Sequence, residues 1–241
     1  MPGLYRDEGI VLKTIKLGEA DRILTVFTRD NGKIRAVAKG VRKTKSRFGG
    51  RLEPFTRVDL LIYRGRKDLD TVTGAHVVAS NAGLQRDFDT IASAGAMAEM
   101  VEKITPDRES AGPVYSLLAA GLSALSDGRG PSVLPAFMVK LLSITGFHPE
   151  LKTCAGCGEP AFLGGFSAAL GGAICESCWL DDPDATGVAP DRLVLLRRLL
   201  SDDFGFPVEQ PLVEEVTHIL RRYTEYHLER PLKSLQMLRA V

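Results

Sequence analysis

The pattern of apolar residues changes once along the chain, near Ser80 and Asn81, and this change most constrains the fold. Before it, β-branched and polar residues alternate as in strands; after it, apolar residues recur every three or four positions, as in helices. Strands followed by helices predict an α+β protein in which the two kinds of element are segregated. We therefore expect one domain over residues 1–80 and a helical domain over residues 81–241.

Five short strands are expected in the first domain, over 9–15, 21–29, 34–39, 57–63 and 69–77. Asn31-Gly32 is a hairpin signal, because both residues tolerate the positive φ values of a type I′ turn. Five strands with a long third-to-fourth connection fit a five-stranded Greek-key barrel of the OB type. A flat antiparallel meander has the same periodicity and remains the alternative.

The second domain is expected to hold five helices, over 88–104, 114–125, 132–146, 193–200 and from 211 onward. Ser132 is the expected N-cap of the third, and Pro211 the expected start of the last. Their apolar stripes are interpreted as a helical core without chemistry.

A basic run from Lys33 to Leu52 covers the third strand and the connection after it. It contains no acidic residue and eight basic ones: Lys33, Arg35, Lys39, Arg42, Lys43, Lys45, Arg47 and Arg51. Such a surface attracts phosphate, because each cation that meets a phosphate releases a condensed counterion. Phe48 adds a candidate stacking face for bases. A merely solvated loop is the alternative interpretation.

The charge of the chain is divided unequally. Residues 1–80 contain 17 Lys or Arg and 9 Asp or Glu, net +8, whereas the remaining residues contain 14 and 21, net −7. This asymmetry suggests that one end meets a polyanion and the other end a different partner. No apolar run reaches about 18 residues, so no membrane span is expected. The acidic residues Asp7 and Glu8 lie near the N-terminus, where a signal peptide would have an apolar segment, so no signal peptide is expected either.

Four cysteines form two close pairs, Cys154-x-x-Cys157 and Cys175-x-x-Cys178, with 17 residues between the pairs. This spacing is typical of tetrahedral zinc sites, since each short turn offers two sulfurs and two turns complete the tetrahedron. Gly158 suits a left-handed residue after the first pair. We expect a structural zinc knuckle over residues 148–180, because four sulfurs leave no open position for catalysis, and we expect a reducing cytoplasm.

Other chemistries receive little support. His148-Pro149-Glu150 before a C-x-x-C pair has a faint likeness to zinc nucleobase deaminases, but two further cysteines would saturate the metal. The sequence holds no P-loop and no G-x-S-x-G motif, so we expect no enzyme activity. Asp68 and Asp70 are interpreted as exposed acids at the entry of a strand.

Several segments, taken in order, extend these observations over essentially the whole chain. They are GIVLKTIKLGEADRILTVFTRDNGKIRAVAKGVRK, SRFGGRLEPF, GFHPELKTCAGCG, a second C-x-x-C and YHLERPLKSL. The set closely resembles the bacterial recombination mediator family RecO, and the ordered set is more specific than any single motif.

The resemblance implies an N-terminal OB fold, a helical domain and a zinc knuckle with four cysteine ligands. It implies binding to single- and double-stranded DNA, annealing without ATP, and action with RecR and single-stranded-DNA-binding protein in loading RecA. It further implies a cytoplasmic, nucleoid-associated protein, with the eight basic residues on DNA and the four cysteines on Zn2+. The rivals are an OB-plus-zinc module acting on RNA or in transcription, and an adaptor with incidental affinity for nucleic acid.

Overall fold

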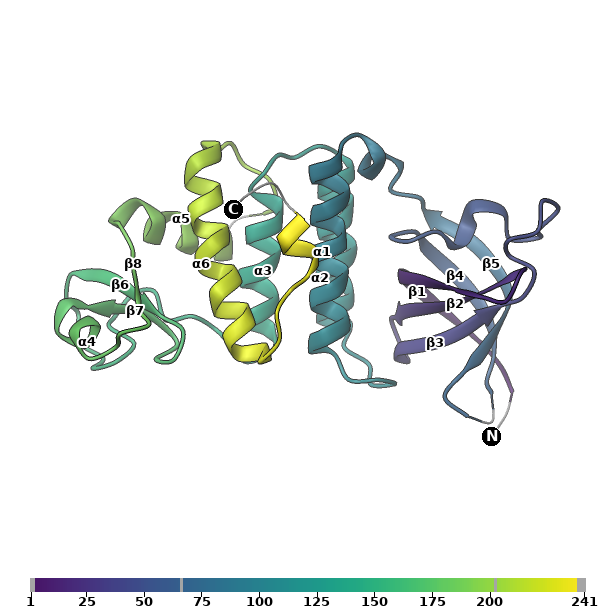
Figure 1. The fold of residues 1–241 in the computed structure, drawn as a ribbon, viewed down its shortest axis with the longest axis horizontal. Helices are drawn as coiled ribbons and strands as arrows, with labels where there is room; N and C mark the ends of the chain where they lie inside the picture. Colours follow the sequence, from purple (N-terminus) through teal and green to yellow (C-terminus); the bar gives the residue numbers. More distant parts are fainter. Residues whose placement is uncertain (1–2, 66, 202, 238–241) are drawn as a thin grey trace. The chain divides into compact units, whose positions relative to one another are not determined.

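The computed structural model describes residues 3–65, 67–201 and 203–237, which form two compact units. Unit 1 comprises Met1–Asp87 and Ala98–Ser126, and unit 2 comprises Phe88–Met97 and Asp127–Val241. The five barrel strands come first and the long helices follow, as expected for an α+β chain, and a small sheet lies among the helices of unit 2 (Figure 1). A domain boundary at residue 80 stays a prediction, because the units follow contacts rather than chain order.

A closed five-stranded barrel dominates unit 1. Its strands run β1-β2-β3-β5-β4 around the barrel, with β1 and β4 paired to close it. This closure confirms the OB-type barrel and excludes the flat meander. The bounds are β1 Leu4–Leu17, β2 Asp21–Thr28, β3 Gly32–Ala38, β4 Arg57–Tyr63 and β5 Asp70–Ala79.

Strand β1 is twice as long as expected because it serves two neighbours. Its first half pairs with β4 and its second half pairs with β2, and the two pairings overlap at Gly9 and Ile10. Gly9 is needed there, since a Cβ on it would lie 2.5 Å from Cγ1 of Val26. The pairing of β3 with β5, which we call the seam between these strands, is short. The two strands run parallel and pair only at Ala36–Asp70 and Val37–Thr71.

The hairpin between β2 and β3 is present, but the expected type I′ turn is wrong. Thr28 pairs with Gly32, which leaves three residues in the loop, and only Gly32 of this turn has a positive φ, of 64°. Three-residue loops of this kind place a glycine in the left-handed region. The buried carboxylate of Asp7 accepts hydrogen bonds from the backbone N–H groups of Asp30 and Asn31, which fixes the loop.

Unit 1 also holds the short 3-10 helix η2 (Ala82–Gln85), the C-terminal part of α1 (Phe88–Ile104) and α2 (Gly112–Ser126). Tyr115 of α2 donates a hydrogen bond to Oε1 of Glu8, and its ring lies 6.2 Å from that of Phe27. These contacts join α2 to the outer face of the barrel.

Unit 2 is built around three mutually packed helices, α3 (Val133–Ile144), α5 (Pro190–Ser201) and α6 (Gln210–Leu228). All the expected helices are present. The expected cap by Ser132 is wrong: its hydroxyl makes no capping hydrogen bond and donates instead to the carbonyl of Phe206, 3.0 Å away. The 3-10 helix η3 (Ser234–Met237) ends the described chain.

A small sheet in the order β7-β6-β8 lies between α3 and α5 in the sequence. It consists of β6 (Leu163–Ser167), β7 (Gly172–Cys175) and β8 (Thr186–Gly187), with the short helix α4 (Glu176–Leu180) after β7. Strands β6 and β7 form an antiparallel hairpin between the two cysteine pairs.

Candidate nucleic-acid interface and metal centre

The connection from β3 to β4 is anchored in the barrel and is not a free loop. Phe48 and Leu52 are each only 1% exposed and belong to the barrel core, with the short helix η1 (Gly49–Leu52) between β3 and β4. Phe48 is therefore not available for stacking on bases, and that expectation is wrong. We call residues 39–51 the cationic loop, because six of the eight expected basic residues lie in it.

Hydrogen bonds tie the start of the cationic loop to the turn between β1 and β2. The N–H of Gly40 donates to Oδ1 of Asp21 at 2.7 Å, and the N–H of Arg42 donates to the carbonyl of Ala20 at 2.9 Å. The Arg42 guanidinium also donates to the carbonyls of Gly18 and Glu19. Arg42 is thus both exposed and structural.

The remaining cations of the run differ in whether their side chains contact other parts of the protein. Arg35 on β3 and Lys39, Lys43 and Lys45 in the loop are exposed, and among the described residues their side chains have no hydrogen bond or ion pair. Arg47 lies over the Phe48 ring, 4.8 Å from its centroid, and its carbonyl accepts a hydrogen bond from the Arg51 guanidinium. Most of the run therefore points to solvent from a fixed backbone.

Lys33 differs from the others. Its Nζ donates to the carbonyls of Glu102 and Thr105 at 2.6 and 2.8 Å, and it pairs with Asp107 at 3.2 Å. An ammonium has three donors, so these three acceptors use all of them. Lys33 places its charge against the C-terminal carbonyls of α1, where a cation is favoured by the helix dipole.

Sequence reasoning missed Lys16, an exposed cation at the end of β1 that lies near the start of the cationic loop. It pairs across the sheet with Arg22, whose other neighbour is Ala38, directly before Lys39. A lone lysine in a strand has no run of charge to mark it, so only the register places it beside the cationic loop.

Asp70 is fully buried, which corrects the expectation that it is exposed; Asp68 is exposed as expected. The carboxylate of Asp70 accepts hydrogen bonds from Tyr5 Oη at 2.8 Å, from the Gly65 N–H at 2.9 Å and from two nitrogens of Arg108. Desolvation raises the pKa of Asp70, but these hydrogen bonds outweigh it, led by that of Arg108, and hold the pKa below its ordinary value. The cluster fastens the short seam between β3 and β5.

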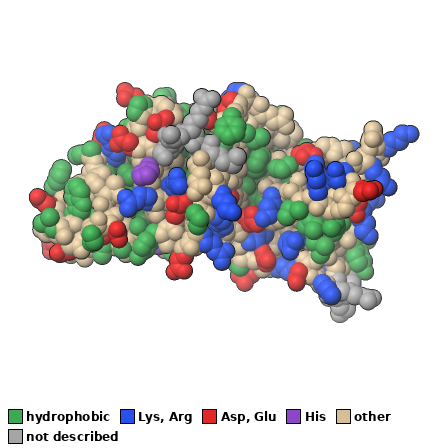
Figure 2. Space-filling view, viewed as in Figure 1, with side chains coloured by type: hydrophobic (Ala, Val, Ile, Leu, Met, Phe, Trp, Pro, Cys, Tyr) green, Lys and Arg blue, Asp and Glu red, His purple; other side chains and the backbone are tan. Residues whose placement is uncertain are grey.

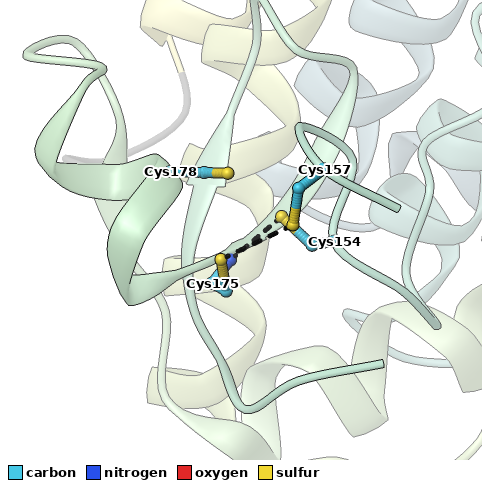
Figure 3. A group of neighbouring side chains, drawn as sticks. All are labelled: Cys154, Cys157, Cys175 and Cys178. Carbon is cyan, nitrogen blue, oxygen red and sulfur yellow. Dashed lines mark hydrogen bonds between the residues drawn. The ribbon is translucent and has the colours of Figure 1, made fainter. Parts of the chain in front are cut away.

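The four cysteines come together in unit 2, with all four sulfurs within 4.8 Å of one another (Figure 3). Cys154 and Cys157 come from a turn, Cys175 ends β7, and Cys178 lies in α4. The expected left-handed Gly158 is confirmed, with a φ of 77°. The second pair needs no such glycine because it enters the first turn of a helix.

The geometry of the sulfurs fits a metal ion. The sulfurs of Cys157 and Cys175 are 3.9 Å apart, near the edge of about 3.8 Å of a tetrahedron with metal–sulfur bonds of about 2.3 Å. Desolvation opposes ionisation of Cys154, but hydrogen bonds from backbone N–H groups, including that of Cys175, lower its pKa to about 6. Gly156 leaves space for the site, since a Cβ there would lie 2.9 Å from the sulfur of Cys178. These four residues could therefore bind a metal.

The deaminase-like pair does not join this centre. Among the described residues, the metal-compatible cluster contains the four cysteines and neither His148 nor Glu150. Nδ1 of His148 contacts Oγ of Ser143, and the Glu150 carboxylate accepts the N–H groups of Lys152 and Thr153. Both side chains thus shape the loop that enters the first cysteine turn.

Comparison with known proteins identifies the family of this chain. A family model described as Recombination protein O N terminal matches residues 1–81, and one described as Recombination protein O C terminal matches residues 85–236. The chain belongs to the Recombination protein O (RecO) family. Membership makes it a recombination mediator of DNA repair, in a family not known for catalysis.

Relatives of the RecO family match this chain over nearly its full length. DNA repair protein RecO of Bifidobacterium adolescentis is 43% identical over 246 residues, which cover 98% of this chain and 99% of that protein. The proteins of the same name from Frankia casuarinae and Nocardioides sp. are 43% and 40% identical over 241 residues. They cover 98% and 96% of this chain and 98% of each relative. Among the described residues, no helix has the length and hydrophobicity to cross a membrane.

Proposed function

We propose that this chain binds single- and double-stranded DNA through the cationic loop, Arg35 and Lys16, and anneals complementary strands without ATP. With RecR, it helps to load RecA onto single-stranded DNA coated by single-stranded-DNA-binding protein, at the nucleoid in the cytoplasm. The observation that carries the proposal is a cationic loop anchored by Phe48 and Leu52, with exposed ammonium groups that have no partner in the described chain.

Annealing then follows from charge and needs no hydrolysis. Two complementary strands repel each other, and cations on a barrel surface lower this repulsion while raising the local concentration of the strands. Base pairing supplies the free energy. Because Phe48 is buried, phosphate contacts rather than stacking dominate the interaction, and we expect little dependence on base sequence.

Of the eight expected contacts, Lys33 contributes least in this proposal, since its three donors already have acceptors in the protein. Arg42 and Arg51 both hold the loop and present positive charge. The strongest contacts are assigned to Lys39, Lys43 and Lys45.

We assign Zn2+ to Cys154, Cys157, Cys175 and Cys178, one ion per chain. Bound there, the ion supplies structural stability, which in small zinc modules reaches about 10 kcal/mol or more. The sulfur ligands leave no open position for a substrate.

An annealing assay on the purified protein, without nucleotide, tests the proposal. The wild type should accelerate pairing of complementary DNA strands, and the triple variant K39A/K43A/K45A should lose most of that acceleration. RNA strands of equal length form a parallel arm, because faster annealing of RNA than of DNA would favour the RNA-binding rival. Annealing that strictly requires ATP would refute the mechanism.

A further inference from the structure

The segment around the cysteine cluster is strongly acidic. Residues 153–191 contain no Lys or Arg and carry six acidic residues: Glu159, Glu176, Asp181, Asp182, Asp184 and Asp191. In Figure 2, red and green side chains gather over this part of unit 2, whereas blue side chains are frequent over the barrel of unit 1. We call residues 153–191 the cysteine module. Its acidic surface repels a phosphate backbone, so the module is a poor DNA contact.

An apolar slot opens in this acidic surface. It has a volume of about 610 Å³, and its lining includes Phe162, Trp179 and Leu180 together with Glu176 and Asp182. Phe162 is 74% exposed and Leu180 84% exposed. Exposed large apolar side chains that gather in one place mark interaction sites more often than they mark ordinary surface.

Glycines form the floor beneath the aromatic rings. A Cβ on Gly164 would lie 3.4 Å from the ring of Phe162. A Cβ on Gly165 or Gly187 would lie 3.2 or 3.0 Å from the ring of Trp179. The Trp179 ring therefore rests on strands β6 and β8 and is held at the slot, because any larger residue beneath it would displace it.

We propose that this slot docks a segment of a partner protein that carries Lys or Arg around an apolar anchor. The apolar lining needs an aliphatic or aromatic anchor. Glu176 in the lining is an exposed acid that attracts cations, and so is Asp181, which lies in the chain between the lining residues Leu180 and Asp182. A cation can also lie over the face of Trp179.

Nucleic acid and a second copy of this chain fit less well. Residues 153–191 offer phosphates six acidic side chains and no Lys or Arg of their own, and in the described chain Arg222 of α6 contacts this segment only through the carbonyl of Asp184 and the hydroxyl of Thr186. The cationic loop of a second copy offers no accessible anchor, because Phe48 and Leu52 are buried in its barrel. The carboxylate of Asp182 already accepts hydrogen bonds from Ser167 Oγ and the Asp184 N–H, so the attraction is assigned to Glu176 and Asp181.

Trp179 is the only tryptophan of the chain, so its fluorescence reports directly on the slot. The full-length protein would be titrated with a short synthetic peptide of alternating Lys and Leu. A matched peptide of Lys and Ser keeps the positive charge but lacks the apolar anchor, and a peptide of Glu and Leu keeps the anchor but reverses the charge. Oligo(dT) serves as the nucleic-acid probe. We expect the Lys–Leu peptide alone to change the emission of Trp179.

Two variants locate the binding. Leu180→Ser removes an exposed anchor contact, and E176Q/D181N removes two exposed charges; each should weaken the Lys–Leu peptide about tenfold. Neither should alter DNA binding by the barrel, so failure here is distinguishable from failure of the proposed DNA function. Equal binding of the Glu–Leu peptide, a Trp179 response to oligo(dT), or a dimer that Leu180→Ser dissolves in sedimentation would each overturn the proposal.

Discussion

The three exposed lysines of the cationic loop give the sharpest prediction. Lys39, Lys43 and Lys45 have no hydrogen bond or ion pair within the described chain, so replacing all three by Ala should leave the barrel intact. The loop keeps its shape in this variant, because its buried anchors Phe48 and Leu52 are untouched. Any loss of DNA binding then reports on charge and not on folding.

The magnitude follows from counterion release. Each phosphate neutralised on a single strand contributes about −0.7 to the slope of log K against log salt concentration, so three lost contacts should reduce the slope by about 2. If the two proteins bind equally at about 1 M salt, a slope change of about 2 over one decade lowers the affinity of the variant roughly 100-fold at about 0.1 M. Replacement of Arg42 is less informative, since its guanidinium also holds the turn between β1 and β2.

Fluorescence anisotropy of labelled oligo(dT) over a series of salt concentrations measures both quantities. The matched control removes three exposed cations of unit 2, with the changes K152A, R230A and K233A, and should keep the wild-type slope. Circular dichroism checks that both variants are folded. An unchanged slope in the loop variant, or an equal fall in the control, would refute the assignment of DNA binding to the cationic loop.

Four further substitutions test the structural roles. Lys33→Met should lower the free energy of unfolding by about 2 kcal/mol in urea denaturation, because it removes charged hydrogen bonds to the part-buried carbonyls of Glu102 and Thr105. It should leave the salt slope unchanged; a fallen slope would make Lys33 a DNA contact. Asp70→Asn should cost about 2 kcal/mol at pH 7, because a neutral amide weakens the charged hydrogen bonds that the buried carboxylate accepts from Tyr5, Gly65 and Arg108. Because the folded pKa of Asp70 lies below 3.8, its ionisation stabilises the fold above about pH 4 and this is lost as the pH falls through the folded pKa. The variant should therefore lack that part of the acid dependence, and an unaltered acid limb would contradict the assignment. The wild type should hold one equivalent of zinc, measured by mass spectrometry. Cys154→Ser should abolish this binding, and Gly156→Ala should reduce it. Full zinc occupancy in both variants would contradict the four-cysteine site.

Local signals in the sequence were sufficient for the barrel and the metal-compatible cluster. Alternation, a glycine at the β2–β3 hairpin and a long connection indicated the OB-type barrel, and two short cysteine spacings indicated the cluster, because each signal acts within a few residues. The type of the hairpin turn was wrong, since the carboxylate of Asp7, about two dozen residues away in the chain, holds the loop.

Features that depend on long-range contacts could not be predicted. Phe48 looked like an exposed ring because its neighbours are charged, but its side chain enters the barrel core. Asp70 looked exposed because its partner Arg108 lies beyond α1 and carries no local signal. Lys33 belonged to a basic run and yet meets the end of a helix about 70 residues later. In each case a tertiary partner, rather than propensity, decides burial.

The short seam between β3 and β5 has a consequence for how the barrel can be separated from the rest of the chain. The guanidinium of Arg108 reaches Asp70 from outside the strands, and the acceptors of Lys33 lie on the same distant segment. A fragment that stops at residue 80 would keep all five strands and lose both fastenings. In such a fragment the pairing of β3 with β5 should open locally, and the backbone amides there should exchange with solvent first. The smallest barrel that is stable by itself therefore extends through α2.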